Sequence, residues 1–218
     1  MKTGIKLAIN ILFAFICINA NADTPDPLWS KTVQHLQKAQ KYVARDIEQK
    51  LEAEKDGVKK QATMKAQISS WKDNTPVYSI LSVEPKPKDG ANLKAIDFEA
   101  MMKGVNRLMC DDQTSVKRSN GQKIEGVDAV LFEIDEGSVQ KIKAKIWVQP
   151  ETGEVYRYQI RVSVPLAVEF DTQVRFDDTP NGVRLGVIRE TEFASKIPFK
   201  KAKGHLLENL SNWVLRPQ

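Results

Sequence analysis

The chain has 218 residues and carries 33 lysines and arginines against 28 aspartates and glutamates, which gives a formal net charge of +5. A nucleic-acid partner is not expected, because the basic residues alternate with apolar ones instead of forming the clusters typical of nucleic-acid binding. This length is sufficient for one domain with a sizeable core.

The first residues predict a secretory signal peptide. Lys2 and Lys6 precede a mostly apolar run, and Ala20-Asn21-Ala22 supplies small residues at the cleavage positions. The run is shorter than the roughly twenty residues that cross a bilayer, and a retained membrane anchor is the alternative. We therefore expect a signal peptide over residues 1–22, a single domain over residues 23–218 and a periplasmic location.

Cysteine usage predicts no internal disulfide. Cys17 falls inside the expected signal peptide, and Ile16 before it is not the small residue of a lipoprotein signal. Cys110 then remains alone, so the fold must be stable without a cross-link. Its apolar neighbours Leu108 and Met109 favour a buried thiol, with an interchain disulfide or a reactive thiol as the alternatives.

Residues 26–57 predict one long amphipathic helix. Asp26-Pro27 is typical of a helix start, with aspartate as the N-cap and proline in the first turn. Asp56-Gly57 suits the C-cap. The apolar residues that recur between them at helical spacing are Val33, Leu36, Val43, Ile47 and Leu51.

Alternation with a period of two follows Gly57. Residues 62–69 and 77–83 predict two strands joined by a turn, with Met64 and Ile68 on the apolar side of the first. A proline-containing loop follows, and residues 93–109 predict a second helix. The apolar side of that helix carries Ile96, Met101, Val105, Leu108 and Met109.

From Val116 onward the sequence predicts about five or six antiparallel strands joined by short turns. Residues 127–134 are almost continuously apolar and predict a central strand, and Asn181-Gly182 predicts a hairpin turn. In residues 141–164, basic and polar side chains alternate with apolar ones on both sides of the turn at 149–153. Residues 204–215 place Leu206, Leu210, Trp213 and Val214 at helical spacing and predict a terminal helix.

These elements predict an α+β fold. We expect a strongly curved antiparallel sheet, an unclosed barrel, because strand twist accumulates across a sheet. The long N-terminal helix, the second helix and the C-terminal helix would cover its apolar face as a lid.

No motif predicts catalysis or a cofactor. His35 and His205 are far apart in the sequence, and no histidine or cysteine spacing indicates a metal site. Nucleophile motifs are absent, and Asp177-Asp178 lies in an expected turn, where aspartate bonds to the backbone. We expect a protein that is not an enzyme and needs no cofactor.

Apolar side chains on the expected inner face are candidates for a ligand cavity. If helices and sheet do not close completely, these side chains would hold an acyl chain, while the alternative is that they pack the core. The candidates are Met64, Ile68, Leu131, Ile146, Tyr156, Tyr158, Ile160, Phe170, Val174, Phe176 and Leu185.

One hairpin carries a family resemblance. Residues 147–153, Trp-Val-Gln-Pro-Glu-Thr-Gly, followed by Val155-Tyr156-Arg157, resemble the central hairpin of the LolA/LolB-like outer-membrane lipoprotein-sorting proteins. The resemblance implies an unclosed barrel with helical lids and a periplasmic protein that binds lipid, acylated protein or another amphiphile for transfer or sensing. It also implies transient membrane contact. The chain lacks the lipidation signal of the LolB type.

Two other interpretations remain open. An envelope interaction or assembly module would have a packed core and would bind a partner protein through a strand edge or the basic face. A helix-grip domain of the lipid-transfer type would also bind a hydrophobic ligand but with another strand order.

Overall fold

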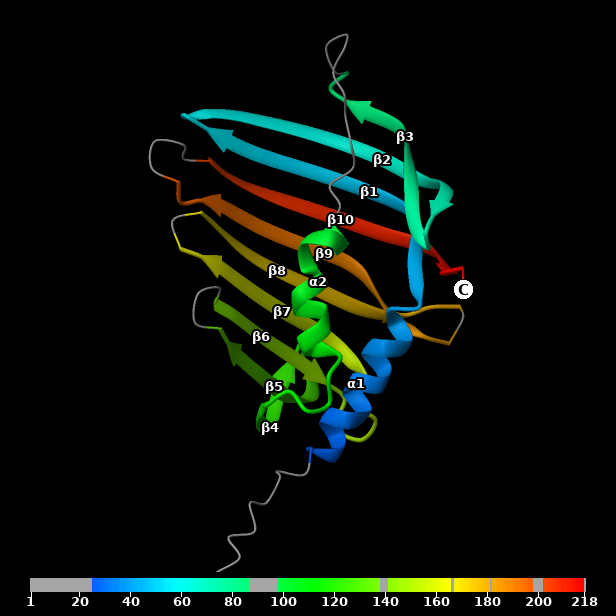
Figure 1. The fold of residues 1–218 in the computed structure, drawn as a ribbon, viewed down its shortest axis with the longest axis vertical. Helices are drawn as coiled ribbons and strands as arrows, with labels where there is room; N and C mark the ends of the chain where they lie inside the picture. The colour runs from blue at the N-terminus through cyan, green and yellow to red at the C-terminus, as the bar shows by residue number, and fades with distance from the viewer. Residues whose placement is uncertain are drawn as a thin grey trace, which may run out of the picture.

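A single antiparallel sheet of ten strands dominates the computed structural model, which describes residues 25–86, 98–137, 141–165, 167–180, 182–197 and 202–217 (Figure 1). The helices are α1 (Pro27–Ala39) and α2 (Phe98–Met109). The strands are β1 (Tyr42–Lys55), β2 (Val58–Lys72), β3 (Thr75–Glu84), β4 (Lys117–Ile124), β5 (Val127–Glu136), β6 (Lys141–Val148), β7 (Val155–Val164), β8 (Val168–Asp178), β9 (Arg184–Ser195) and β10 (Ala202–Leu215). The expected signal peptide lies outside the described residues.

The strand order is β3-β2-β1-β10-β9-β8-β7-β6-β5-β4. Two groups of sequential strands, β1–β3 and β4–β9, are therefore joined through β10, which pairs with β1 on one side and β9 on the other. Strands β3 and β4 form the two edges and do not pair with each other. The predicted antiparallel, unclosed sheet is confirmed.

Helix α1 begins as predicted but ends much earlier. The Asp26 carboxylate accepts hydrogen bonds from the backbone N–H groups of Leu28 (2.8 Å) and Trp29 (3.1 Å), so it caps the helix. The helix ends at Ala39, and residues 42–55 form β1. The prediction of one long N-terminal helix is therefore wrong.

The predicted C-terminal helix is also wrong, because residues 202–215 form β10. Leu206 and Leu210 are four residues apart, and so are Ile47 and Leu51 in β1. A separation of four keeps two side chains on one side of a strand as well as on one side of a helix. Backbone pairing between β1 and β10 along most of their length favours the strand over the helix for both segments.

Helices α1 and α2 lie over the same face of the sheet, which we call the helix side (Figure 1). The Trp29 ring of α1 packs edge-on against Phe132 of β5, with ring centroids 5.3 Å apart. The second predicted helix is confirmed over residues 98–109, while residues 93–97 lie outside the described part. The buried core combines both helices with β5–β8 and contains Leu28, Trp29, Val33, Leu36, Val105, Met109, Val130, Phe132, Ile134, Ala144, Ile146, Val148, Val155, Ile160, Val162, Val174 and Phe176.

The opposite face, the outer side, carries the basic alternation predicted from residues 141–164. Lys143 pairs in register with Arg161, and Lys145 with Gln159, while Ile146 pairs with Tyr158 on the helix side. Lys143 and Lys145 are exposed and form ion pairs with carboxylates of β5. The basic side chains of β6 therefore face water. None of the described helices is both long enough and apolar enough to cross a membrane.

Candidate functional site

Most of the predicted cavity residues on β6–β8 contribute to the packed core. Ile146, Ile160, Val174 and Phe176 are buried between the sheet and the two helices. Tyr158 is partly buried beside them, and its ring lies 5.4 Å from that of Phe176. These side chains therefore fill the space under α1 and α2 together with the helix residues.

The structure does not bring four other candidates into that cluster. Leu131 lies on the outer side, since it pairs in register with Trp147. The ring of Tyr156 lies under the Arg184 guanidinium, 5.0 Å from its carbon. Leu185 is buried outside the core cluster, and Phe170 is partly exposed on the helix side.

Met64 and Ile68 lie on the helix side of β2, beyond the core. A line of directly paired residues, which we call a register row, crosses the sheet from Val83 and Met64 to Ile146 and Phe132. Directly paired residues share a face of the sheet, so Met64 lies on the same side as the core residues Ile146 and Phe132. Around Met64 and Ile68 the helix side carries further apolar side chains that are neither fully buried nor part of the core. We call this set the apolar surface: Ile47, Leu51, Met64, Ile68, Tyr78, Ile80, Val83 and Leu210.

A buried polar group separates the apolar surface from the core. In the same register row, Gln49 of β1, Glu208 of β10 and Arg189 of β9 are neighbours. Gln49 Nε2 donates to Glu208 Oε1 at 2.9 Å, and Arg189 Nε donates to Glu208 Oε2 at 2.5 Å. The Glu208 side chain is 1% exposed. Because charges resist burial in hydrocarbon, this trio divides the helix side into two apolar areas.

A small pocket adjoins one end of the apolar surface. It has a volume of about 280 Å³ and lies where β1 begins and β10 ends. Ile68 belongs both to this pocket and to the apolar surface. The pocket is lined by Arg45, Ile68, Ser69, Ser70, Trp71, Val214 and Leu215.

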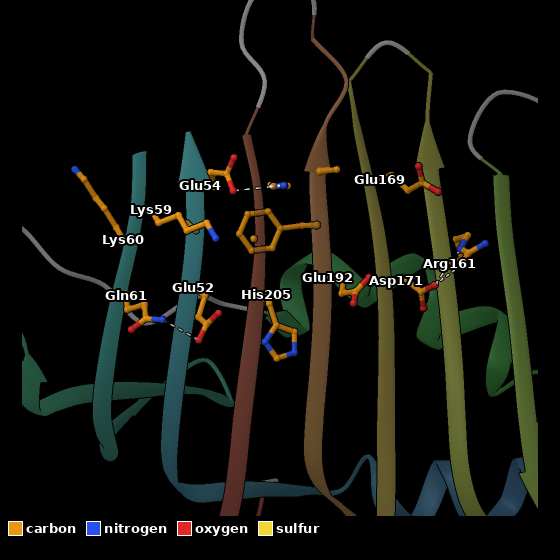
Figure 2. Close-up of a pocket in the computed structure, with 15 residues that line it drawn as sticks. Glu52, Glu54, Lys59, Lys60, Gln61, Arg161, Glu169, Asp171, Glu192 and His205 are labelled. Atoms are coloured by element: carbon orange, nitrogen blue, oxygen red, sulfur yellow. Dashed lines mark hydrogen bonds and ion pairs between the residues drawn. The ribbon is translucent and has the colours of Figure 1, made fainter. Parts of the chain in front are cut away.

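A larger, open groove of about 620 Å³ lies on the outer side (Figure 2). Its walls are mainly charged side chains that pair with one another. Arg161 bonds to Asp171 at 2.5 Å, and Lys203 lies 3.4 Å from Glu54. Gln61 donates to Glu52 at 3.1 Å. The hydrogen bonds to Asp171 raise the pKa of the Arg161 guanidinium, which stays positively charged. These mutual pairs indicate a solvated sheet face and provide no nucleophile.

The titratable groups of the described residues do not form a catalytic or metal-binding arrangement. Among those residues, histidine, cysteine and carboxylate side chains form no group of three or more that could hold a metal ion. His35 lies on α1, and His205 lies on the outer side of β10 in the groove (Figure 2). Burial raises the pKa of the Cys110 thiol to about 11, so the reactive thiolate is scarce at neutral pH.

Sequence reasoning missed the Gln49–Glu208–Arg189 trio and the position of Arg45. Both depend on β10 lying beside β1, and nothing in the local sequence indicates this long-range pairing. Once residues 42–55 and 202–215 are treated as strands, the polar Gln49 and Glu208 on otherwise apolar sides become a visible signal.

Comparison with known proteins gives a few structural similarities. No protein-family model and no curated protein matches the chain. The structure is similar to a DUF1329 family protein from Desulfovibrio piger, at 10% identity and a TM-score of 0.43, covering 88% of this chain and 93% of that chain. It is also similar to a putative outer membrane lipoprotein-sorting protein domain from Vibrio parahaemolyticus, at 8% identity and a TM-score of 0.38, covering 86% and 93%. Neither similarity assigns a family or a ligand to this chain.

Proposed function

We propose that the protein is a non-enzymatic binding protein of the periplasm that holds the hydrocarbon chain of a lipid, acylated protein or similar amphiphile. Its role would be transfer or sensing in the cell envelope. The observation that carries this proposal is the apolar surface on β10, β1, β2 and β3. Its side chains lie together on one side of the sheet, yet they stay outside the packed core and remain partly exposed.

Burial of a hydrocarbon chain on this surface would supply the binding energy. Each methylene group that leaves water contributes about 0.8 kcal/mol. The loss of ligand freedom offsets part of this gain. A chain of about a dozen carbons therefore suffices for binding without any covalent or charged contact to the protein.

The proposal places Met64 and Ile68 at the centre of the site. Their register neighbours Gln49, Val83 and Tyr78 connect β1, β2 and β3 into one surface. The candidates on β6–β8 would take part only if a ligand separated the helices from the sheet. The site is thus shifted sideways from the space under α1 and α2 toward the β3 edge.

The test is direct ligand analysis of the protein purified from an envelope fraction. We expect solvent extraction and mass spectrometry to find bound lipid, and we expect a fluorescent fatty acid to bind. The variant Ile68→Glu should weaken probe binding at least about tenfold, because the new carboxylate would be buried against hydrocarbon. Val127→Glu on β5, at a side chain 49% exposed, is the matched control. A protein that carries no lipid and ignores the probe would contradict the proposal.

A second candidate function is an envelope assembly module, and the β3 edge favours it. Val77 and Leu81 on this strand are 41% and 65% exposed. Residues 75–83 carry no charge, whereas the opposite edge, β4, carries Lys117, Arg118 and Lys123. Charged residues on an edge strand discourage pairing with other chains, so β3 is the edge suited to adding an extended segment of a partner protein.

Strand addition at β3 is testable with a charged edge. Leu81→Lys should abolish capture of an envelope partner that the unmodified protein captures, while Val127→Lys should retain it. Binding should also slow hydrogen exchange of the β3 amides. Equal capture by both variants would exclude the β3 edge as the binding site.

A further inference from the structure

The small pocket beside Ile68 has features of a headgroup site. It lies next to a shift in the β2–β3 pairing register between Ile68 and Ser70. Such irregularities re-aim side chains and often accompany binding sites. Its lining combines apolar side chains with one cation, Arg45, and two serines, and it contains no carboxylate.

Arg45 has no competing partner among the described residues. It is exposed, and its guanidinium forms neither a hydrogen bond nor an ion pair with any of them. The neighbouring Asp46 instead accepts hydrogen bonds from Gln67, at 2.8 Å, and from Asn212. Five other arginines pair with carboxylates, whereas exposed Arg175, like Arg45, has no carboxylate partner among the described residues. The five paired arginines are Arg118, Arg157, Arg161, Arg184 and Arg189.

We infer that this pocket binds the anionic headgroup, a carboxylate or phosphate, of an amphiphile whose chain lies on the apolar surface. This inference rests on the proposed function and adds the chemical class of the ligand. The guanidinium of Arg45 presents a planar donor set that matches both anions. Ser70 offers a hydroxyl group, whereas the Ser69 hydroxyl already donates to the Val77 carbonyl at 3.1 Å.

The dimensions fit a headgroup with a chain extending from it. A volume of about 280 Å³ is at the lower limit for small-molecule pockets, which start at about 300 Å³. The chain would leave the pocket past Ile68 and follow β2 toward Met64. These two side chains are separated by four residues on one side of β2, or about 13 Å along the strand.

The test compares dodecanoate with dodecanol, which share a chain but differ in charge. Displacement of a fluorescent fatty-acid probe should show that the unmodified protein binds dodecanoate about tenfold more tightly. Arg45→Gln should remove this preference and leave dodecanol binding unchanged. Arg175→Gln, at an exposed arginine outside the pocket, should retain it. A carboxylate preference that survives in Arg45→Gln would overturn the inference.

The outcomes separate the two proposals. Equal binding of dodecanoate and dodecanol by the unmodified protein would overturn the headgroup site and leave the apolar surface supported. Binding of neither would overturn both. Dodecyl phosphate distinguishes the two anions. If it binds more tightly than dodecanoate, and this binding depends on Arg45, the headgroup is a phosphate. If the protein binds inorganic phosphate through Arg45 but does not bind dodecanol, its ligand is a free anion. That result would overturn the inference that the ligand is an amphiphile.

Discussion

Arg189 Nε lies 2.5 Å from Glu208 Oε2, and this pair is buried on the helix side between the core and the apolar surface. The two side chains are 13% and 1% exposed. Gln49 donates a hydrogen bond to the other oxygen of the carboxylate. The pair therefore holds β1, β9 and β10 together at the junction of the two strand groups.

Breaking this pair should destabilise the fold strongly. Arg189→Met leaves the Glu208 carboxylate buried without its cation, and we expect a loss of about 3–5 kcal/mol in the free energy of unfolding. The double variant Arg189→Met/Glu208→Met should recover much of it, because no charge then remains buried. Urea denaturation measures both. Arg161→Met removes the exposed ion pair to Asp171 and should cost no more than about 1 kcal/mol. A similar loss in both single variants would contradict the prediction.

A methyl group at Gly204 should also destabilise the protein. Its Cβ would lie 2.7 Å from the Glu52 backbone oxygen on β1, in addition to contacts with the Phe193 ring. Since a paired strand cannot move away freely, we expect Gly204→Ala to cost about 1–3 kcal/mol. Gly104→Ala on α2 is the control. Its Cβ would meet nothing within 4 Å, so a gain of up to about 1 kcal/mol is expected from helix propensity. Thermal unfolding of the two variants should therefore shift in opposite directions.

Asp26 should stabilise the fold at neutral pH, and this contribution should be lost in acid. Partial burial raises its pKa, but hydrogen bonds from Arg118 and from the N–H groups of Trp29 and Leu28 lower it, and the net pKa lies below 3.8. Its contribution is therefore complete above about pH 4 and is lost as the pH falls through the lowered pKa. Asp26→Ala should cost about 0.5–2 kcal/mol at pH 7 and less at pH 3.

Asp26→Asn separates the cap from the charge. Asparagine is an equally good N-cap, so this variant should keep most of the stability at pH 7. Its difference from the unmodified protein should vanish in acid. A difference between Asp26→Ala and the unmodified protein that stays constant down to pH 2 would exclude the charge as a cause.

Cys110 should react slowly in the folded protein. Burial raises its pKa from 9.0 to about 11, which lowers the thiolate fraction below pH 9 by about 100-fold. Mass spectrometry should detect slow alkylation by iodoacetamide at pH 8 and fast alkylation in urea. An exposed cysteine made by Val127→Cys in a Cys110→Ala background provides the reference rate. Comparable rates at both positions would contradict a raised pKa of the partly buried thiol.

The same pKa shift affects stability in alkali. The unfolded thiol ionises near pH 9, whereas the folded thiol stays protonated until about pH 11. The stability of the unmodified protein relative to Cys110→Ala should therefore fall between these two pH values, from a difference at pH 7 that reflects side-chain packing alone. Denaturation of both proteins at pH 7 and pH 10.5 measures the difference.

Local patterns predicted much of the sheet. The alternation in residues 141–164 predicted both sides of β6 and β7, and Asp26-Pro27 predicted the start of α1. Each of these signals is complete within a few neighbouring residues. The short turns between the strands then follow from glycine, such as Gly153 with a positive φ of 78°.

The same patterns failed where apolar residues are four positions apart, because this spacing keeps two side chains on one side of a strand and also on one side of a helix. Ile47 and Leu51 are compatible with a helix or a strand, and the choice depends on pairing with neighbouring β2 and with β10, more than a hundred residues away. The candidate site was predicted only at Met64 and Ile68. Packing of α1 and α2 against β5–β8 makes Ile146, Ile160, Val174 and Phe176 core residues, and packing of this kind depends on the whole fold.

The position of β10 also constrains how the chain can fold. Gln49 and Glu208 are 159 residues apart in sequence, yet they bond side by side in the centre of the sheet. Until residues 202–215 arrive, the β1–β3 group has no neighbour and the β4–β9 group keeps β9 as an open edge. Contacts of such long range slow folding. A nascent polypeptide would thus keep the edges of β1 and β9 unpaired until β10 has been synthesised.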